Sequence, residues 1–378
     1  MGIDRRLRIA HVSDCFAPRT GGIETQVAAL AEQQRRAGHL VRVITATPTD
    51  PSADAAVDVA VPVERITVRL PGDLPIHPRT RARVLASLRA DPVDVVHIHA
   101  GVVSPFAWGA ARAVRAAGLP GLVTVHCVWG PLARPGFAVA DGVIGWTHWG
   151  LQLAAVSDMA AATVARALPR AAPVLVTPNG IDPEAWRTTP IPGSPNVLRA
   201  VTVSRLAPRK RILALMDIWA AASKELAARG IRLEATLVGD GPLRERAERR
   251  ARDRGLDVRF TGRLNPVDIR PVFASADVFV QPSVRESFGI AALEARTAGL
   301  PVIARSQTGS TAFITDGRDG VLVDDDDGVV EALVRIGVDP QLRATLTTAA
   351  RSEPTAQGWP AVLEAVDRAY RAAIARRP

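Results

Sequence analysis

The stretch VFVQPSVRESFGIAALEARTAGLPVIAR, residues 278–305, carries the pattern that decides the fold. Val278–Gln281 is short, apolar and closed by a proline, which predicts a buried strand. Glu286–Ala298 follows with the apolar spacing of a helix, and a glycine ends it. Val302–Arg305 is again short and apolar. A strand, a helix and a further strand in this order predict one unit of a parallel α/β sheet.

The same alternation extends outward over the chain of 378 residues. In the first half, Arg8–Ser13 and Leu40–Thr45 have the pattern of strands on either side of a helix. In the second half, Leu198–Val203 and Leu233–Val238 have it too. Between the halves, Thr188–Pro195 is rich in Pro, Gly, Ser and Thr, as a linker is. Length and linker together predict two domains.

We therefore expect an α/β protein with two Rossmann-like, doubly wound parallel-sheet domains that face each other across a cleft. The expected ranges are 1–187 for the N-terminal domain and 188–358 for the C-terminal domain. Residues 359–378 are expected to form a C-terminal helix that packs back on the N-terminal domain. Sheets of this kind bind ligands at the carboxyl ends of their strands, so the cleft would suit a substrate in two parts.

Composition narrows the choice of partners. The net charge of +9 fits an anionic partner: a nucleotide diphosphate, a lipid phosphate or a membrane surface. Nucleic acid fits less well, because the chain has no basic low-complexity tail, aromatic-basic interleaving or zinc-ligand spacing. Two isolated cysteines make neither a disulfide framework nor a metal site. With no signal peptide and no apolar run of ~20 residues, we expect a cytoplasmic protein, with peripheral contact at the inner membrane face as a second option.

The spacing of two glutamates predicts a nucleotide-sugar site. Glu286 and Glu294 are eight residues apart, a rise of ~12 Å on a helix, which is about the span from the sugar to the ribose of a nucleotide sugar. The backbone N–H groups of Phe288, Gly289 and Ile290 lie between them at the expected helix N-terminus, which attracts a diphosphate. Gly289 has no Cβ, so a phosphate can approach closely.

These motifs resemble the family 4 glycosyltransferases with the two-domain B-type fold. The resemblance extends over nearly the whole chain, and it is specific because the motifs occur in the family's order and spacing. The segments that carry it are ESFGIAALE with AGLPVIA, GGIETQVAALAEQQRRAGHLVRVIT, VSDMAAATV, PNGIDPEAW, VSRLAPRKR, LVGDGPLR, ADVFVQPS and DGRDGVLV.

The resemblance implies roles for particular side chains. Glu286 would contact the donor sugar, and Glu294 would hold the ribose hydroxyls. Arg205 and Lys210 would offset the charge of the diphosphate and of the departing nucleotide. His126 would contact the donor sugar from the N-terminal domain, which binds the acceptor. No divalent metal or other cofactor would be required, because the nucleotide-diphosphate sugar is itself a co-substrate.

The resemblance also implies backbone contacts to the nucleotide. The loop at Gly21 and Gly22 would meet the diphosphate and the acceptor, and Gly239 would lie near the nucleotide. Backbone groups at Arg263 and Leu264 would meet the base. The family often has a glutamate in the turn after the E-x7-E helix, whereas residues 307–312 (QTGSTA) contain no acid; the backbone N–H groups of Thr308–Ser310 are the remaining candidates there.

The donor is expected to be a UDP-sugar or GDP-mannose. Guanine favours a carboxylate that accepts from its N1–H and N2–H, and Asn265 offers only an amide, which favours uridine. The acceptor would be a hydroxyl of a glycolipid, an inositol lipid or a small natural product. ESFGI and HIHA resemble the phosphatidylinositol mannosyltransferases, and the secondary-metabolite glycosyltransferases are nearly as similar.

Some segments favour structural interpretations. His97 and His99 alternate on a buried strand; His99 could face the cleft, and His97 is expected to pack. Residues 131–149, with two tryptophans, favour core packing over an acceptor wall or a membrane-facing surface. Asp324–Asp327 favours loop and N-cap duty over a metal motif.

We expect a retaining, metal-independent glycosyltransferase that transfers a hexosyl group to a hydroxyl acceptor. Two other functions fit the same fold: a catalytically silent nucleotide-binding protein, and a nucleotide-sugar 2-epimerase. A silent protein would bind nucleotide without releasing it from a sugar, and an epimerase would release it without any acceptor.

Overall fold

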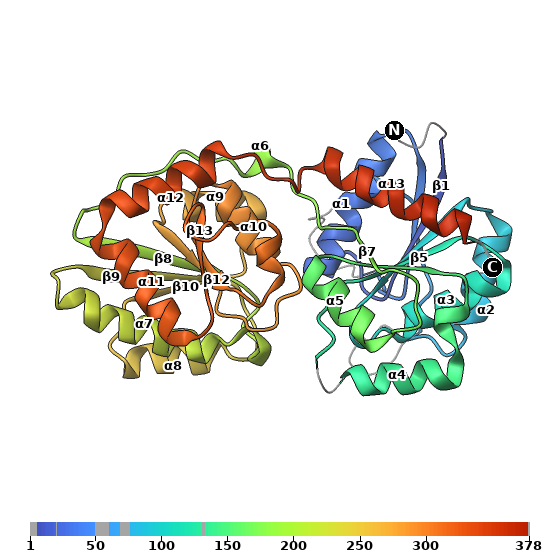
Figure 1. Ribbon diagram of the computed structural model, residues 1–378, viewed down its shortest axis with the longest axis horizontal. Helices are drawn as coiled ribbons and strands as arrows, with labels where there is room; N and C mark the ends of the chain where they lie inside the picture. The colour runs from blue at the N-terminus through green and yellow to red at the C-terminus, as the bar shows by residue number, and fades with distance from the viewer. Residues whose placement is uncertain (1–5, 20, 50–59, 69–75, 131–132, 377–378) are drawn as a thin grey trace. The chain divides into compact units, whose positions relative to one another are not determined.

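The computed structural model describes residues 6–19, 21–49, 60–68, 76–130 and 133–376. The chain divides into two compact units (Figure 1). The N-terminal unit comprises Met1–Gly180 with Gln357–Pro378, and the C-terminal unit comprises Ile181–Ala356. Each unit contains one parallel sheet, of seven and six strands respectively, which confirms the predicted fold class of two doubly wound α/β domains.

The division between the units lies before the linker-like segment, at Gly180 rather than at the expected residue 187. The reason is that residues 181–187 are held by the C-terminal unit. The Arg270 Nη1 donates to the Ala185 carbonyl at 3.0 Å, and the centre of the Trp186 ring lies 5.9 Å from that of Phe273. The linker-like composition begins only at Thr188, so it did not indicate which unit holds the residues before it.

The sheet of the N-terminal unit has the strand order β3-β2-β1-β4-β5-β6-β7, which reverses between β1 and β4. The strands are short and apolar, as expected for parallel strands covered on both faces. Their bounds are β1 (Arg8–Ser13), β2 (Leu40–Thr45), β3 (Val63–Arg65), β4 (Val95–Ala100), β5 (Gly121–Val125), β6 (Gln152–Ala155) and β7 (Leu175–Val176).

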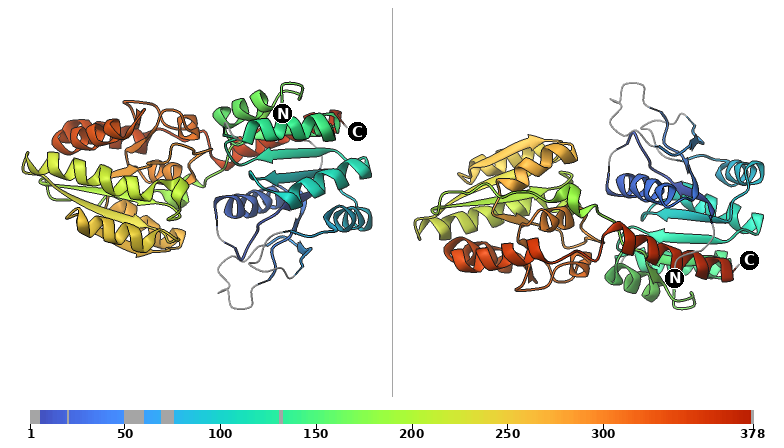
Figure 2. Two further views of the ribbon diagram at one scale, coloured as in Figure 1. Left: turned by 90° about the horizontal axis from the view of Figure 1, so that it is seen from below. Right: turned by 90° about the horizontal axis from the view of Figure 1, so that it is seen from above.

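Helices cover both faces of this sheet (Figure 2). Alternate strand residues, such as Ile9 and Val95, pack against α1 and α13 on one face. Their neighbours, such as Ala10 and Val96, pack against α2 and α3 on the other. The C-terminal helix α13 thus belongs to the core of the N-terminal unit. The helices are α1 (Gly22–Arg36), α2 (Thr80–Ala90), α3 (Pro105–Ala117), α4 (Ala133–Ile144), α5 (Asp158–Ala167) and α13 (Trp359–Ala375), with a 3-10 turn η1 (Trp146–His148).

The sheet of the C-terminal unit has the order β10-β9-β8-β11-β12-β13, and it reverses between β8 and β11. Its core is built on the fully buried Trp219 and on leucines of α7 and α11. The strands are β8 (Val197–Val203), β9 (Arg232–Val238), β10 (Val258–Gly262), β11 (Val278–Val280), β12 (Val302–Arg305) and β13 (Gly320–Val323). The helices are α6 (Pro183–Trp186), α7 (Ile212–Ala227), α8 (Arg244–Asp253), α9 (Pro266–Ala274), α10 (Ile290–Thr297), α11 (Asp326–Val338) and α12 (Pro340–Ser352), with 3-10 turns η2 (Pro208–Lys210) and η3 (Gly309–Ala312).

The four consecutive aspartates of this unit have the capping role that the sequence favoured. Asp325 is the N-cap of α11 and accepts from the Gly328 N–H at 2.8 Å. Asp326 accepts from both Arg211 and Arg305. The cluster is therefore held by a helix terminus and two guanidinium groups.

Candidate active site

Two predicted site residues meet where the six-stranded sheet reverses its strand order. Lys210 ends η2, which follows β8, and Glu286 follows β11. Although 76 residues separate them, the Lys210 Nζ lies 2.5 Å from the Glu286 Oε2. Their side chains are only 24% and 13% exposed. In a doubly wound sheet, the carboxyl ends of the strands beside the reversal are the usual ligand position, and this ion pair spans it.

Arg205 lies on the same loop as Lys210, and its side chain is exposed. Within the described part of the chain its guanidinium forms no ion pair, unlike the ammonium of Lys210. The neighbouring Arg211 is bound instead to Asp326, with an Nη1–Oδ1 distance of 2.6 Å. Among the described residues, Arg205 and the likewise exposed Arg209 are therefore the arginines of this loop whose charges are available to a ligand.

The helix between the two glutamates begins later than the sequence predicted. Its first residue is Ile290 rather than Glu286, and Gly289 is its N-cap. Gly289 has φ +96°, and a Cβ there would lie 2.7 Å from the Ser310 Oγ, so both conformation and space require glycine. Glu286 therefore lies in the loop before the helix, and the ~12 Å helical rise does not apply. The helix N-terminus still lies between the two acids, with first-turn N–H groups that have no intrahelical acceptor.

Residues 307–312, the turn after β12 that contains no acid, are hydrogen-bonded to the loop that carries Glu286. The Gly309 N–H donates to the Glu286 carbonyl at 2.8 Å, and the Ser310 hydroxyl donates to the Phe288 carbonyl at 3.3 Å. A Cβ on Gly309 would lie 2.0 Å from the Ser287 carbonyl oxygen. The N–H of Gly309 is therefore already used inside the protein, which corrects the expectation that it serves the ligand. Its role is to fix the backbone that carries Glu286.

Glu294 lies in the middle of α10, partly buried between Leu293 and Ala295, which are fully buried. Removal of its carboxyl from water raises the pKa of Glu294 to about 8. The group is therefore mostly protonated at pH 7. A carboxyl with a strongly shifted pKa near a helix N-terminus is typical of a binding site.

The predicted base loop lies beside the predicted nucleotide turn. The Gly239 N–H donates to the Gly262 carbonyl at 2.8 Å, which brings the ends of β9 and β10 together. Gly239 has φ +130°, and a Cβ there would lie 2.0 Å from the Ser204 carbonyl oxygen at the end of β8. Arg263 is exposed and Leu264 half-buried. All the predicted donor residues of this unit apart from Glu294 thus follow the carboxyl ends of its strands.

Gly21, one of the two predicted glycines after β1 in the N-terminal unit, lies beside the carboxylate of Glu24. Gly21 is the N-cap of α1, which begins at Gly22, and its backbone is extended. A Cβ on Gly21 would lie 2.4 Å from the Glu24 carboxylate, which folds back over this helix N-terminus. The N-terminus of α1 therefore has a negative charge beside it, and contact of Gly21 and Gly22 with the diphosphate stays a prediction.

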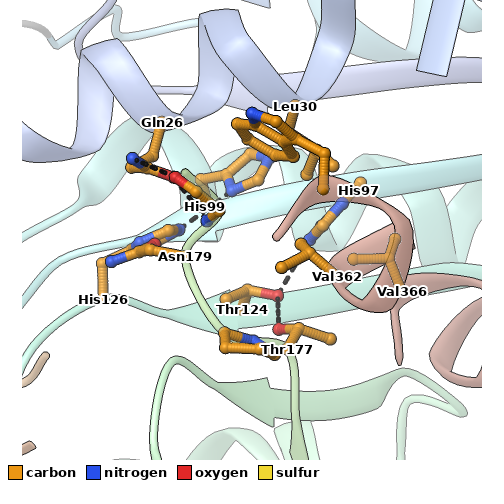
Figure 3. Close-up of a pocket in the computed structure, with 13 residues that line it drawn as sticks. Gln26, Leu30, His97, His99, Thr124, His126, Thr177, Asn179, Val362 and Val366 are labelled. Atoms are coloured by element: carbon orange, nitrogen blue, oxygen red, sulfur yellow. Dashed lines mark hydrogen bonds between the residues drawn. The ribbon is translucent and has the colours of Figure 1, made fainter. Parts of the chain in front are cut away.

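His126 follows β5 directly and lines a pocket with about 300 Å³ of empty space (Figure 3). The His126 Nε2 lies 3.0 Å from the His99 Nδ1. Burial lowers the pKa of His126 to about 4, so the ring is neutral at pH 7. His97 and His99 both line the same pocket, so the expectation that they have different surroundings is wrong: residues two apart on a strand share a face.

The sequence did not single out Asp14, Gln34 or Tyr370. Asp14 follows β1 and accepts from the N–H groups of Phe106 and Ala107 at the start of α3, and burial raises its pKa to about 6. An acid directly after the first strand was the available signal for Asp14. Gln34 and Tyr370 lie inside amphipathic helices, where no local pattern distinguishes them from core residues.

The fold and the site together define a two-domain glycosyltransferase of the B-type. Residues 198–339 match the family model described as "Glycosyl transferases group 1", and residues 20–185 match "Glycosyltransferase Family 4". A phosphatidyl-myo-inositol mannosyltransferase of Mycolicibacterium smegmatis is 31% identical over 93% of this chain and 90% of its own length. The chain belongs to the family 4 glycosyltransferases, in the branch of the phosphatidylinositol mannosyltransferases, and is a nucleotide-sugar glycosyltransferase.

Other relatives and solved structures agree with this assignment. A GDP-mannose-dependent alpha-mannosyltransferase of Mycolicibacterium smegmatis is 29% identical over 98% of this chain and 99% of its own length. Among solved structures, Anabaena HepE in complex with UDP and glucose superposes with a TM-score of 0.73 at 21% identity, over 92% of this chain and 94% of that one. Sucrose-phosphate synthase of Thermosynechococcus elongatus superposes with a TM-score of 0.75 at 20% identity, over 97% and 98%. At such identities these structures support the fold.

None of the helices in the described ranges combines the length and the apolar character that crossing a bilayer requires.

Proposed function

We propose that the chain transfers mannose from GDP-mannose to a hydroxyl acceptor, with retention of anomeric configuration and without a divalent metal. Relatives that span nearly the whole chain are named as GDP-mannose-dependent mannosyltransferases, which supports this donor. The single observation that carries the proposal is the Lys210–Glu286 pair, 2.5 Å apart at the reversal of the six-stranded sheet. It holds a cation and an acid together, one suited to a phosphate and the other to sugar hydroxyls.

The diphosphate would bind at the start of α10. The N–H groups of Gly289 and Ile290 and the positive end of the helix favour an anion there. Arg205 and Lys210 follow β8, the strand adjacent to β11, and add two positive charges. Two fixed cations and a helix terminus would supply the charge stabilisation that other glycosyltransferases obtain from a metal ion. Transfer would therefore persist in the presence of a chelator.

The reaction would proceed on one face of the sugar. The bond from the anomeric carbon to the phosphate oxygen breaks, and a bond to the acceptor oxygen forms on the same face. The acceptor's proton passes to the phosphate oxygen that leaves, so the products are GDP and a retained α-mannoside. Arg205 and Lys210 would stabilise the charge that develops on the phosphate. Glu286 would orient the mannose by accepting hydrogen bonds from its hydroxyls.

A UDP-sugar is the second candidate donor, and Asn265 is the observation that favours it. Asn265 is exposed at the start of α9 and makes no side-chain cap bond. Its amide oxygen can accept from one N–H, whereas guanine offers two adjacent donors, N1–H and N2–H. For GDP-mannose, the carboxylate of Asp268, exposed in the first turn of the same helix, could accept from guanine N1–H and N2–H.

The proposed acceptor is an inositol glycolipid. Relatives are named as phosphatidyl-myo-inositol and phosphatidylinositol monomannoside mannosyltransferases, which supports this class. The net charge of +9 suits an anionic lipid headgroup. Peripheral contact with an anionic membrane surface follows from the same proposal, and vesicle sedimentation with and without phosphatidylinositol tests it.

The deciding experiment measures nucleotide binding and release. Thermal shifts of the full chain with GDP, UDP and ADP should rise most with GDP, and Arg205→Ala and Glu294→Ala should lose the rise. GDP release from GDP-mannose should then require the inositol lipid and persist in EDTA, and NMR of the product should show the α anomer. Binding without release would indicate a silent protein, release without acceptor a 2-epimerase, and a response to UDP alone would overturn GDP-mannose as donor.

A further inference from the structure

Arg211, the residue between η2 and α7, has an unusual backbone conformation. Its φ is +55° and its ψ is +34°, in the left-handed helical region, and within the described ranges it is the only residue other than glycine with a positive φ. A side chain in this region crowds its own backbone, so the position ordinarily favours glycine. Such a conformation persists only where the surroundings impose it, and it is more frequent at functional sites.

The side chain of Arg211 provides bonds that can impose this conformation. Its Nη1 donates to Asp326 Oδ1 at 2.6 Å, and its Nη2 donates to Asp326 Oδ2 at 2.7 Å. Two parallel bonds of this kind fix the orientation of a guanidinium as well as its position. Nη1 also donates to the Pro282 carbonyl at 3.3 Å, at the start of the segment that carries Glu286. One side chain therefore links the loops of Lys210 and Glu286 to the first residue of α11.

Asp326 is itself bound by a second arginine, Arg305. Asp326 is the first residue of α11, and Arg305, which donates to it, is the last residue of β12. Arg305 is only 3% exposed, and this burial lowers the pKa of its guanidinium. Its Nε and Nη1 have no hydrogen-bond partner in the part of the chain that the structure describes, so Asp326 is its hydrogen-bonded counterion. The carboxylate is thus a firm attachment point for Arg211.

The packing of η2 leaves its direction to the residues at its two ends. None of the three residues of η2 is buried. Leu206, fully buried, holds the chain before the turn, and Arg211 follows the turn. The helices α7 and α11 share the core of the unit through buried apolar side chains, so they do not depend on the Arg211–Asp326 pair to stay together. The pair therefore acts on the turn and on Lys210, its last residue.

The backbone of Arg211 determines where Lys210 points. Because Arg211 is left-handed, the 3-10 turn stops at Lys210 and does not continue into α7, which begins at Ile212. Rotation about the backbone bonds of Arg211 would swing η2 relative to α7 and would carry Lys210 with it. In the folded chain, Lys210 Nζ lies 2.5 Å from Glu286 Oε2, and a displacement of about 1 Å would lengthen that bond beyond hydrogen-bond distance.

Direct binding of the diphosphate by Arg211 is the competing interpretation. Both Nη atoms of Arg211 are already bonded to the Asp326 carboxylate, which offsets the positive charge. A phosphate would have to compete with this carboxylate for the same N–H groups. The geometry therefore favours a role of Arg211 through Lys210.

We propose that Arg211 is a positioning residue whose side chain, bound to Asp326, holds the left-handed turn that aims Lys210 at Glu286. Glycine at this position would permit the turn, whereas arginine bound to Asp326 imposes it. The effect on sugar transfer rests on the proposed function, in which Lys210 stabilises the leaving phosphate. The effect on the position of Lys210 does not.

The chain has two lysines, so the position of Lys210 can be read directly. In protein labelled with ¹³C-lysine, Lys210 and the exposed Lys224 should give two side-chain Cε signals, assigned by Lys210→Arg and Lys224→Arg. Glu286→Gln gives the reference signal of Lys210 without its carboxylate partner. In Arg211→Ala, the Lys210 signal should move at least halfway to this reference while the Lys224 signal stays. A wild-type Lys210 signal in folded Arg211→Ala protein would overturn the proposal.

Arg211→Gly separates the side chain from the backbone. Glycine loses the bonds to Asp326 but adopts a positive φ readily, whereas alanine loses the bonds and disfavours that φ. We expect kcat to fall about tenfold in Arg211→Ala and about threefold in Arg211→Gly, with the Lys210 signal displaced in the same order. Equal displacement in the two variants would show that the left-handed turn does not set the position of Lys210.

Asp217 in the same unit is a matched control for the carboxylate. Its side chain is 37% exposed, against 38% for Asp326, and it too is bound by two arginines, Arg250 and Arg254. Asp326→Asn should displace the Lys210 signal, and Asp217→Asn should leave both the signal and kcat unchanged. Similar displacement in both variants would show that the loss of any ion pair disturbs the unit, which contradicts a specific role.

The Lys210 signal needs no substrate, so it separates this proposal from the proposed function. If Asp326→Asn does not fold because Arg305 loses its counterion, the two Arg211 variants decide. If the signal moves in Arg211→Ala and kcat does not fall, Lys210 is not used in transfer, and the proposed function loses the pair that carries it. If kcat falls and the signal stays, Arg211 acts on the reaction by another route, and the positioning role is wrong.

Discussion

The charge of Glu294 depends on its surroundings more than that of any acid expected to contact the donor. Burial raises its pKa to about 8, so it is mostly protonated at pH 7. Two adjacent ribose hydroxyls donate two hydrogen bonds, and only the carboxylate accepts both. Binding of the nucleotide sugar should therefore release a proton, and affinity should rise by on the order of tenfold between pH 7 and pH 9.

Isothermal titration calorimetry checks this coupling. At pH 7, the apparent binding enthalpy should differ between two buffers of unequal ionisation enthalpy, by an amount that corresponds to nearly one proton released. In Glu294→Gln the difference should vanish and the affinity should be weak at every pH. A wild-type enthalpy independent of the buffer would show that the donor does not bind to an ionised Glu294.

Lys210 allows a second test at a single residue, because the chain has one other lysine. Loss of the ammonium removes a positive charge from the leaving phosphate and leaves Glu286 without its partner at 2.5 Å. Lys210→Ala should lower kcat by about 10²–10³-fold, and Lys210→Arg should restore part of it. Lys224→Ala changes an exposed lysine of the same unit and should leave turnover unchanged. Equal rates for the two alanine variants would remove Lys210 from the reaction.

Strands were easier to predict than the start of the decisive helix. Apolar runs such as Arg8–Ser13 and Val302–Arg305 coincide with β1 and β12. A strand that is buried on both faces consists mostly of consecutive apolar residues, so the local sequence is enough to predict it. The helix α10 begins four residues after its predicted start at Glu286. The loop before it is held by Gly309, in contacts from a segment 23 residues further along. Local periodicity contains no information about such contacts.

The candidate site likewise contains some residues that could be predicted from the sequence and others that could not. Glu286 and Glu294 were predicted from their spacing and the resemblance, and Lys210 from the resemblance; the structure brings Lys210 and Glu286 together, and their roles stay predictions. The residues that are hydrogen-bonded to His126 and behind it were not predicted. The buried hydrogen bonds from His126 through His99, His11 and Gln34 to Tyr370 join segments up to 336 residues apart, as in the bond from Gln34 to Tyr370. Residues that act by position inside helices resemble ordinary core residues until the fold brings them together.

A buried ion pair links the helix that carries Glu294 to Asp319, the residue before β13. Arg296 of α10 donates to Asp319 at 2.8 Å, and their side chains are 5% and 1% exposed. Asp319→Ala leaves a buried guanidinium without its partner and should lower the free energy of unfolding by about 3–5 kcal/mol. The affinity for the nucleotide sugar should fall as well, because α10 would no longer be fixed.

A second aspartate of the same turn is the control. Asp316 accepts from the Leu322 N–H and is exposed. Asp316→Ala should therefore cost less than about 1 kcal/mol in urea unfolding. Similar losses for the two variants would mean that the buried ion pair does not hold α10.

At the scale of the molecule, the prediction of two parallel-sheet domains is confirmed, and the two units differ in the charge states of their buried groups. In the N-terminal unit, four buried histidines are neutral in the folded chain: His11, His97, His99 and His126. Unfolding raises their pKa values toward about 6.5, so their contribution to stability is complete above pH 6.5 and decreases below it, down to about pH 4 for His11 and His126. Asp14, with its pKa raised to about 6, acts in the opposite direction as one group against four.

The C-terminal unit has the opposite dependence at Glu294. Its folded pKa of about 8 exceeds the value for an unfolded chain, so protonation on acidification stabilises the folded form between pH 8 and about 4.5. Each group changes stability by about 1.4 kcal/mol per pH unit within its window. As the pH falls from 7 to 5, the N-terminal unit should therefore lose stability while the C-terminal unit keeps or gains it.

Hydrogen exchange of the full chain measures both units in one experiment. Peptides that contain β4 (Val95–Ala100) should lose protection between pH 7 and pH 5, after correction for the intrinsic exchange rate, whereas peptides that contain β11 (Val278–Val280) should not. In His97→Asn, one of the four neutral rings is absent, so the loss in β4 should be smaller by about one group's share. Similar losses of protection in β4 and β11 would show that the four buried histidines do not determine how the stability of the N-terminal unit depends on pH. A difference confined to β4 would mean that acid opens the N-terminal unit first, because unfolding returns its four buried imidazoles to water, where they bind protons.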